Sequence, residues 1–367
     1  MKNVLANFKI DGEFVSCVPY GEGHINDTYL VTFKNDPIGL YILQRINHNI
    51  FKDVKGLMNN ISLVTNYLKE KEHDVDGRKV LTIVKTKDDK DYYYDEANDK
   101  YYRVYIFVKD SLTLQKASTK ELFEESAIAF GRFVNLLADF DTTPLIEVIK
   151  DFHNSEERFN HFVKTLKEDK LDRAKYCQEE IKFILDRKDD CSKIVNLLKE
   201  NKLPTKVTHN DTKLNNVLLD INTLKALCVI DLDTVMPGSS LYDFGDSIRF
   251  GCNNASEDEK DLSKVTFNID YFYAFTKGYL SQVKDSLNQY ELDNLVFGAK
   301  LMTLECGIRF LDDYLDGDHY FKIHRDEHNL DRCKTQLKLV LEIEKHFDEL
   351  NDIVKSIMKT YSGSINK

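Results

Sequence analysis

The spacing of the apolar residues changes near residue 110, and this change most constrains the fold. Before that point, short runs rich in β-branched and aromatic residues are separated by turn residues, which is typical of strands. These runs cover residues 13–20, 28–33, 39–46, 79–86 and 101–108. Between the third and fourth runs lies a stretch with apolar residues at helical spacing, namely Leu57, Ile61, Val64 and Leu68. The first part of the chain is therefore predicted to be a small β-rich lobe with one helix.

The rest of the chain has mainly helical spacing. Helices are expected over residues 119–140, 153–200 and, as the last element, 325–360. A short strand-rich island at residues 205–232 interrupts them. We therefore expect an α+β protein with two parts, an N-terminal lobe at 1–109 and a larger, mainly helical lobe at 110–367.

Composition excludes several classes of protein. The net charge of −11 disfavours a dedicated nucleic-acid binder, which needs a basic face. No run reaches the roughly 18–20 apolar residues of a membrane span, and the first residues lack the apolar region of a secretory signal. The seven cysteines are irregularly spaced and include no CxxC pair, which favours a reducing cytoplasm over a disulfide framework or zinc site. We expect a cytoplasmic protein that binds neither nucleic acid nor membrane.

The strand-rich island carries acids and amides at a distinctive spacing. In "THNDTKLNNVLLD", Asp211 is followed five residues later by Asn216, and Asp231 follows the apolar run "ALCVI". One interpretation is a simple hairpin, with "KVT" and "NVLL" as strands and the polar residues as its turn. The alternative is a catalytic loop followed by a metal-binding hairpin. In kinases an Asp orients the acceptor hydroxyl, while an Asn and a later Asp hold Mg²⁺ against the nucleotide phosphates.

The chemistry of these side chains fits the second interpretation. Asp211 would be the catalytic base, and Asn216 and Asp231 would bind Mg²⁺, a hard cation that prefers oxygen ligands. Asp233 points to the same side of an extended segment as Asp231, so a second-metal or substrate role is expected. The alternative for Asp233 is an ordinary solvated acid at the end of a strand.

The stretches "THNDTKLNNVLLD" and "VIDLD" resemble the aminoglycoside phosphotransferase and choline kinase-like family. The resemblance implies the bilobal protein-kinase-like fold, with ATP as co-substrate and Mg²⁺ as cofactor. Within that family, five segments resemble the branch that phosphorylates the anomeric hydroxyl of N-acetylhexosamines, GlcNAc and GalNAc. They are "GEGHINDTY", "YILQRINHNIFKD", "HNDTKLNNVLLD", "VIDLDTVMPGSSLYDFGDSIR" and "GIRFLDDYLDGDHYF".

The resemblance also implies residue roles. His24, Arg309 and Tyr320 match sugar-contacting positions, together with Asp211 and Asp233. Arg309 could instead form a surface ion pair with one of the nearby acids, Asp312 or Asp313, and Tyr320 could simply pack.

Asp243 is expected to brace the catalytic loop through backbone amides, as an acid does at this place in the wider family. The Asp-Phe-Gly run that begins at Asp243 is not the kinase metal motif, because Asp231 already occupies the end of the strand.

The nucleotide site is expected in the N-terminal lobe. Its assigned residues are Asn26, Thr28, Arg45, Phe107 and Val108. Kinases usually pair a strand Lys with a helix Glu. Here Gln44 or Arg45 stands in the strand, and Asn59 and Asn60 stand in the helix. Arg45 could bind phosphates in two-pronged fashion, or it could be a surface Arg.

Two other functions remain open. One is a kinase of the same fold that acts on choline, an aminoglycoside or another small alcohol, since "FLDDYLDGD" would suit a cationic acceptor. The other is a non-catalytic nucleotide-binding pseudokinase, which only the missing Lys–Glu pair supports. The sequence does not tell which N-acetylhexosamine epimer is preferred, whether ATP or GTP is the donor, or what the oligomeric state is.

Overall fold

The computed structural model describes residues 1–21, 25–74 and 76–363. The chain divides into two compact units. Unit 1 comprises residues 1–113, 139–150 and 217–237, and unit 2 comprises residues 114–138, 151–216 and 238–367. The first crossing lies close to the expected boundary after residue 109. The chain then returns to unit 1 twice, so the hairpin that carries Asp231 belongs with the N-terminal strands and differs in this from the expected division.

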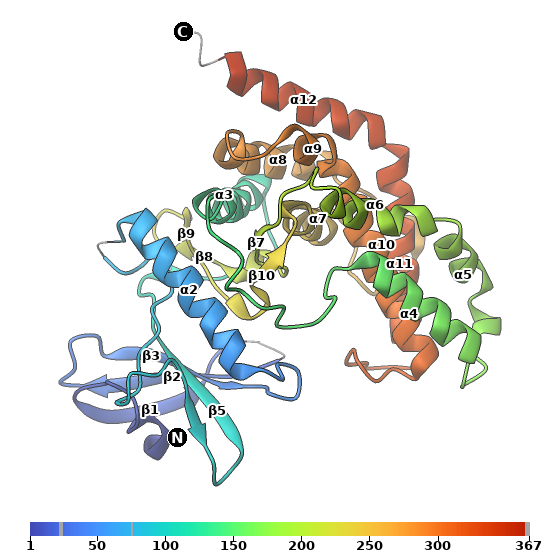
Figure 1. Cartoon of the computed structure of the whole chain (residues 1–367). Coiled ribbons are helices and arrows are strands. Elements are labelled where there is room, and N and C mark those ends of the chain that lie inside the picture. Colours follow the sequence, from blue (N-terminus) through green and yellow to red (C-terminus); the bar gives the residue numbers. More distant parts are fainter. Residues whose placement is uncertain (22–24, 75, 364–367) are drawn as a thin grey trace. The chain divides into compact units, whose positions relative to one another are not determined.

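Unit 1 is built on a five-stranded antiparallel sheet with the strand order β1-β2-β3-β5-β4 (Figure 1). The strands are β1 (Glu13–Pro19), β2 (Asp27–Lys34), β3 (Leu40–Ile46), β4 (Tyr93–Asp95) and β5 (Lys100–Ile106). Fully buried Val31, Leu43 and Val104 lie in the core of this unit. Among the described residues, the α-helices of this unit are α1 (Lys2–Leu5) and α2 (Val54–Glu72). The predicted apolar stripe of α2 is buried.

A second, three-stranded antiparallel sheet in unit 1 contains the β8–β9 hairpin, which leads to Asp231. It consists of β6 (Ser111–Leu112), β8 (Val217–Asp220) and β9 (Ala226–Val229), in the order β6-β8-β9. After β9 the chain forms a 3₁₀ turn, η3 (Leu232–Thr234), and then β10 (Met236–Gly238), which leads into unit 2. The partners of β8 are therefore β6 and β9.

Two details of the predicted strands were wrong. Residues 79–86 form no regular strand, although their backbone pairs with β5: Val84 N donates to Val104 O at 2.8 Å and Ile106 N donates to Thr82 O at 2.9 Å. The acidic, Tyr-rich segment before β5 contains a strand that was not among the expected runs, β4, which pairs with β5.

Unit 2 is mainly helical. Its α-helices are α3 (Lys120–Leu136), α4 (Ser155–Glu168), α5 (Gln178–Leu185), α6 (Lys188–Lys199), α7 (Ser240–Gly251), α8 (Ile269–Val283), α9 (Gln289–Asp293), α10 (Leu295–Asp316), α11 (His328–Lys345) and α12 (Phe347–Gly363). Short elements are β7 (Lys206–Thr208) and the 3₁₀ turns η1 (Ala174–Tyr176), η2 (Leu214–Asn216) and η4 (Leu262–Lys264).

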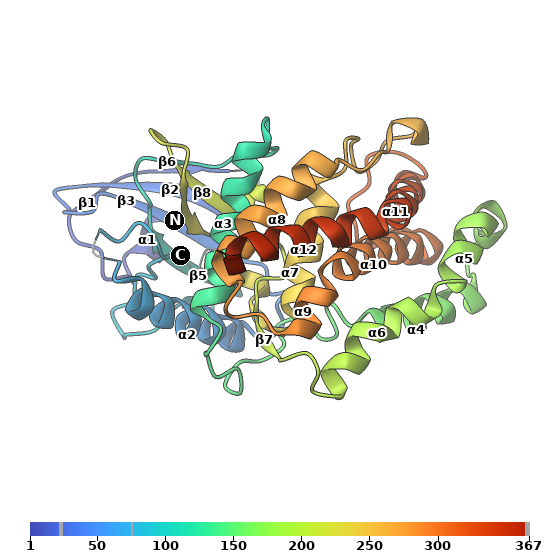
Figure 2. The same ribbon diagram turned by 90° about the horizontal axis from the view of Figure 1, so that it is seen from above.

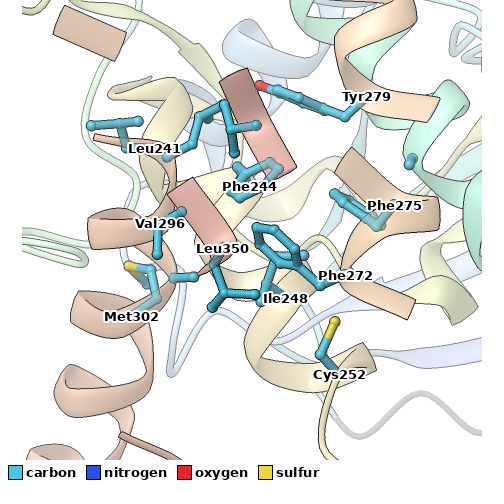
Figure 3. Close-up of a cluster of buried hydrophobic side chains, with 14 of the residues drawn as sticks. Leu241, Phe244, Ile248, Cys252, Phe272, Phe275, Tyr279, Val296, Met302 and Leu350 are labelled. Carbon is cyan, nitrogen blue, oxygen red and sulfur yellow. The ribbon is translucent and has the colours of Figure 1, made fainter. Parts of the chain in front are cut away.

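The core of unit 2 is centred on α7, which packs against α10 (Figure 3). Phe244 of α7 lies against Phe275 and Tyr279 of α8, with ring centroids 5.7 and 5.3 Å apart. Two glycines let α7 and α10 approach closely. A Cβ at Gly245 would lie 2.5 Å from the carbonyl oxygen of Gly298, which leaves no room for any other residue. Helix packing thus accounts for the Phe and Gly of the Asp-Phe-Gly run.

The single helix expected at residues 325–360 is two helices, α11 and α12, which meet at His346 (Figure 2). The break redirects the second helix, because α11 packs on α10 whereas α12 packs on α8. Ile343 of α11 and Leu350 of α12 are both fully buried in the same core cluster. Among the helices that the structure describes, none combines the length and apolar character that a bilayer crossing requires.

Asn60 joins three segments of unit 1. Its side chain is fully buried on α2, and its Nδ2 donates to the carbonyl oxygens of Ile146 and Val235 at 2.8 and 2.9 Å. Its Oδ1 accepts from the backbone N–H of Ile146 at 3.1 Å. Asn60 stands where a kinase helix usually carries Glu, and here the side chain holds backbone rather than a cation.

We predict that Asn60→Ala lowers the free energy of unfolding by about 2–4 kcal/mol, because it leaves buried backbone groups without partners at about 1–3 kcal/mol each. The adjacent Asn59 is exposed and provides a matched control: Asn59→Ala should change the same quantity by less than about 0.5 kcal/mol. Urea denaturation of both variants measures the difference, and equal effects would contradict the role assigned to Asn60.

Candidate active site

The loop that carries Asp211 has no regular structure of its own. It follows β7 and precedes η2, so its peptide groups need partners from other elements. Asp243, at the start of α7, accepts hydrogen bonds from the backbone amides of His209 and Asn210 at 2.8 and 2.7 Å, as the expected brace would. Burial raises the pKa of Asp243, and these hydrogen bonds oppose that shift by favouring the carboxylate.

Two further contacts from α7 hold the next residue of the loop. Thr212 donates its backbone N–H to Asp246 at 3.2 Å and its hydroxyl to the carbonyl oxygen of Asp243 at 2.6 Å. Ser247 donates its hydroxyl to the carbonyl oxygen of Thr212 at 2.8 Å. Asp211 therefore lies in a loop that α7 fixes on both sides.

Asp211 and Asn216, predicted from their spacing, lie together in unit 2. The Nδ2 of Asn216 donates to Oδ2 of Asp211 at 2.9 Å and to the carbonyl oxygen of Asp211 at 2.8 Å. The Asp211 side chain is 29% exposed, so a substrate group can reach it.

Lys213 is a residue of this loop that sequence reasoning missed. Its Nζ lies 2.8 Å from Oδ1 of Asp211. Burial alone would lower the pKa of Lys213, but the negative charges of Asp211 and Asp246 outweigh burial and raise it. Lys213 is thus a permanent positive charge beside the expected base. Its position two residues after Asp211 was the available signal.

The two acids that follow β9, Asp231 and Asp233, have different environments within unit 1. Asp231 follows β9 in the left-handed conformation, with φ of 60°, and is exposed. Asp233 is buried, and its carboxylate forms an ion pair with Arg103 of β5 and accepts a hydrogen bond from Nδ2 of Asn26. Its carboxylate thus already interacts with Arg103 and Asn26, and the metal or substrate role expected from the sequence stays a prediction.

Arg103 supplies a buried cation where Gln44 replaces the usual Lys. Thr28, Gln44 and Arg103 lie side by side in register on β2, β3 and β5. Nε of Arg103 donates to Oε1 of Gln44 at 2.9 Å, and Nε2 of Gln44 donates to the hydroxyl of Thr28 at 3.0 Å. Burial opposes the charge on Arg103, but Asp233 outweighs burial and raises the pKa of Arg103. A single Arg within an aromatic strand was the signal for this pair, since a buried charge needs a partner.

The other residues assigned to the nucleotide are not part of the Thr28–Gln44–Arg103 row. Asn26 accepts a hydrogen bond from the backbone N–H of Asn47 at 2.9 Å. Arg45 forms an exposed ion pair with Asp27 at 2.5 Å, as a surface strand Arg does. Phe107 contacts Tyr20 edge to face, and Val108 is buried.

Of the three residues assigned to the sugar alone, Arg309 and Tyr320 lie together in unit 2, while His24 lies outside the described residues. An Nη of Arg309 donates to the hydroxyl of Tyr320 at 3.3 Å. The guanidinium also lies 5.2–5.6 Å from the ring centroids of three aromatic side chains, those of Phe152, Tyr320 and Phe321. The ring of Tyr320 is 62% exposed, so it is not a core residue.

The acids around Arg309 are engaged elsewhere. Asp313 accepts hydrogen bonds from the backbone amides of residues 319–321 at 2.8–2.9 Å. Asp312 lies 2.7 Å from Nδ1 of His161, and Asp318 forms an ion pair with Arg173 at 2.6 Å. The sequence left open an ion pair of Arg309 with Asp312 or Asp313. In the structure these two acids contact His161 and the backbone of residues 319–321 instead.

The chain matches a known protein family. Residues 16–263, more than half of the chain, match the model of the phosphotransferase enzyme family, APH. The chain belongs to this family. Its matched segment includes the loop of Asp211, the hairpin of Asp231 and the brace Asp243.

Solved structures similar to this phosphotransferase share its fold at low sequence identity. A microcompartment-associated aminopropanol kinase is 15% identical, with a TM-score of 0.61, and the match covers 95% of this chain and 97% of that one. A choline kinase from Cryptosporidium parvum Iowa II is 15% identical, with a TM-score of 0.57 and coverage of 97% and 98%. Amicoumacin kinase hAmiN, in complex with AMP-PNP and Ca²⁺, is 13% identical, with a TM-score of 0.56 and coverage of 92% of each chain.

The donor atoms of this phosphotransferase suit a hard divalent cation. Asp231 offers an exposed carboxylate at the end of a strand. Asn216 uses its Nδ2 toward Asp211, so its other amide atom, Oδ1, is the one that a metal would bind. Carboxylate and amide oxygens are the ligands that Mg²⁺ prefers.

We predict that Arg103→Met lowers the free energy of unfolding by about 3–5 kcal/mol, because it leaves Asp233 as an unpaired buried charge. Arg45→Met is the matched control on the neighbouring strand, where an exposed pair contributes about 0.2–1 kcal/mol. Chemical denaturation of the two variants tests the contrast. A loss below about 1 kcal/mol for Arg103→Met would show that the buried pair does not hold the hairpin.

Proposed function

We propose that this phosphotransferase transfers the γ-phosphoryl group of ATP to the anomeric hydroxyl of an N-acetylhexosamine, GlcNAc or GalNAc. The product is the sugar 1-phosphate. The observation that carries the acceptor assignment is the surroundings of Arg309, and the sequence resemblance described above supplies the particular sugar.

A cationic acceptor fits these surroundings poorly. Aromatic rings bind quaternary ammonium groups through their faces. Here the rings of Phe152, Tyr320 and Phe321 already surround a cation of the chain itself, the guanidinium of Arg309. A guanidinium and a phenol hydroxyl instead offer donors to a neutral, hydroxyl-rich acceptor.

The acidic run "FLDDYLDGD" was the main support for a cationic acceptor. All four acids of the run have partners within the protein, namely Asp312, Asp313, Asp316 and Asp318. The similar kinases named for aminopropanol and choline share the fold at 15% identity, which carries no argument about the acceptor of this chain.

In the proposed reaction, the anomeric oxygen forms a bond to the γ-phosphorus while the bond to the leaving oxygen of ADP breaks. Asp211 orients the sugar hydroxyl and accepts its proton, and Lys213 holds the Asp211 carboxylate in place through its ion pair. Asn216 and Asp231 would hold Mg²⁺, which neutralises phosphate charge when it is bound. We assign Asn26, Thr28, Arg45, Phe107 and Val108 to the nucleotide, and Asp233 to positioning through Arg103.

A pseudokinase is the less favoured alternative. Its only support was the missing Lys–Glu pair. Unit 1 holds a buried ion pair of its own, Arg103–Asp233, beside the Gln44 that replaces Lys. Asp211 and Asn216, the residues proposed to act on the acceptor and the metal, also lie in contact.

The experiment that tests the proposal measures ADP release with GlcNAc, GalNAc, glucose, choline and an aminoglycoside as acceptors, together with loss of the sugar reducing end. Phosphorylation at the anomeric hydroxyl removes the reducing end and gives an acid-labile product. If choline alone is turned over, the acceptor is choline and not an N-acetylhexosamine. ADP release from a sugar that stays reducing would move attack to another hydroxyl.

We predict that Asp211→Asn lowers turnover by about 10²–10⁴-fold, the usual contribution of a positioned base. Binding of Mg·ATP, measured by calorimetry, should change little, because the residue acts on the acceptor hydroxyl. Turnover at the wild-type rate would remove Asp211 from the mechanism.

We also predict that Arg309→Ala and His24→Ala weaken use of the N-acetylhexosamine by roughly 5- to 150-fold in kcat/KM, since each lost buried hydrogen bond costs about 1–3 kcal/mol. The affinity for ATP should not change. Arg332 is a matched control, because its guanidinium also lies near an aromatic ring, that of Phe310, at 5.4 Å. Arg332→Ala should leave kcat/KM within about 2-fold of wild type, which corresponds to under 0.5 kcal/mol.

A further inference from the structure

A buried histidine reaches the catalytic loop from a segment that no motif singled out. His153 precedes α4 and is 9% exposed. Its Nδ1 lies 2.7 Å from Oε1 of Glu305 on α10, and its Nε2 lies 3.3 Å from the carbonyl oxygen of Asn210. The other carboxylate oxygen of Glu305 accepts from the hydroxyl of Ser155 at 2.5 Å. All of these residues belong to unit 2.

The carbonyl oxygen of Asn210 fixes the role of one ring nitrogen. A carbonyl oxygen can only accept a hydrogen bond, so Nε2 of His153 is the donor to Asn210. Burial would raise the pKa of Glu305, but its contact with His153 outweighs burial and lowers it. A buried contact of this kind is expensive in desolvation and contributes little to stability by itself.

The hydrogen on Nε2 of His153 goes to the residue immediately before Asp211. Asn210 has φ of 64°, in the left-handed region, which asparagine adopts more readily than most residues other than glycine. Its backbone N–H is held by Asp243 of α7 and its carbonyl oxygen by His153. The peptide groups of Asn210 are thus held from two different elements, and its conformation sets the direction in which Asp211 leaves the loop.

We propose that His153 and Glu305 are positioning residues for Asp211, acting through the carbonyl oxygen of Asn210. The proposal rests on the catalytic role proposed above for Asp211. Neither side chain touches a substrate in this assignment. Their loss misplaces the base and therefore lowers kcat, while the residues that bind ATP and the acceptor keep their contacts and the KM values stay close to those of wild type.

The test compares His153→Leu, which removes the donor to Asn210, with His153→Gln, whose amide can donate to the same carbonyl. We expect His153→Leu to lower kcat by about 10- to 100-fold, since a small misplacement of a catalytic group can cost up to about 10²-fold. Both KM values should stay within about 2-fold of wild type, and His153→Gln should recover most of the loss.

A matched control separates positioning from stability. His328 is also buried in unit 2, at 3% exposed, and its Nε2 lies 3.1 Å from Oδ2 of Asp258. His328→Leu removes a comparable buried contact away from the catalytic loop. It should lower the melting temperature as His153→Leu does, with kcat unchanged. Equal losses of kcat in the two variants, or unchanged kcat in His153→Leu, would overturn the proposal.

A second readout does not depend on turnover. Hydrogen exchange at the amides of residues 209–212 should be roughly 2- to 10-fold faster in His153→Leu, as expected for loss of one hydrogen bond. It should be unchanged in His328→Leu. Unchanged exchange in His153→Leu overturns the proposal even if no acceptor is found. Faster exchange together with full turnover by Asp211→Asn would instead retain the loop contact and reject the proposed role of Asp211.

Discussion

The loop at His209–Thr212 needs hydrogen-bond partners that it cannot supply itself, and much of unit 2 is arranged around that need. A buried peptide group without a partner costs about 1–3 kcal/mol, so an irregular loop in the interior must be satisfied from other elements. Asp243 meets the need at two amides, and Asp246 and Ser247 meet it at Thr212. The close packing of α7 on α10 at Gly245 and Gly298 fixes where these side chains lie.

Unit 1 solves a related problem with an ion pair. The hairpin of Asp231 and Asp233 lies far in sequence from β5, and a charge contributed by each segment links them. The cost of burying Arg103 and Asp233 is reduced by hydrogen bonds from Asn26 to the carboxylate and from the guanidinium to Gln44. Asn60 adds a neutral link from α2 to the backbone of Val235. These contacts link the segments of unit 1 without the Lys–Glu pair that kinases usually carry.

The sequence predicted what depends on local spacing. The apolar stripe of α2 was predicted from residues a few positions apart, and it is buried. The spacing also singled out Asp211 and Asn216, whose contact with each other only the structure revealed. The family model over residues 16–263 agrees with the resemblance read from the motifs. The sequence did not reveal the partner of Arg103, because that partner is 130 residues away, nor the break at His346, because both helices carry apolar faces that suit one longer helix. His24 lies outside the described residues, so its predicted role stays a prediction.

The surroundings of Arg309 also explain why motif wording alone left the acceptor class open. An acidic run suggests a cationic ligand only if its carboxylates face that ligand. In this chain Asp313 holds the backbone of residues 319–321, which places Tyr320 beside Arg309. The acids thus build a site whose own contacts are a guanidinium and a phenol. The acidic sequence around Arg309 therefore gives no support to a cationic acceptor, because its carboxylates already interact with groups of the protein.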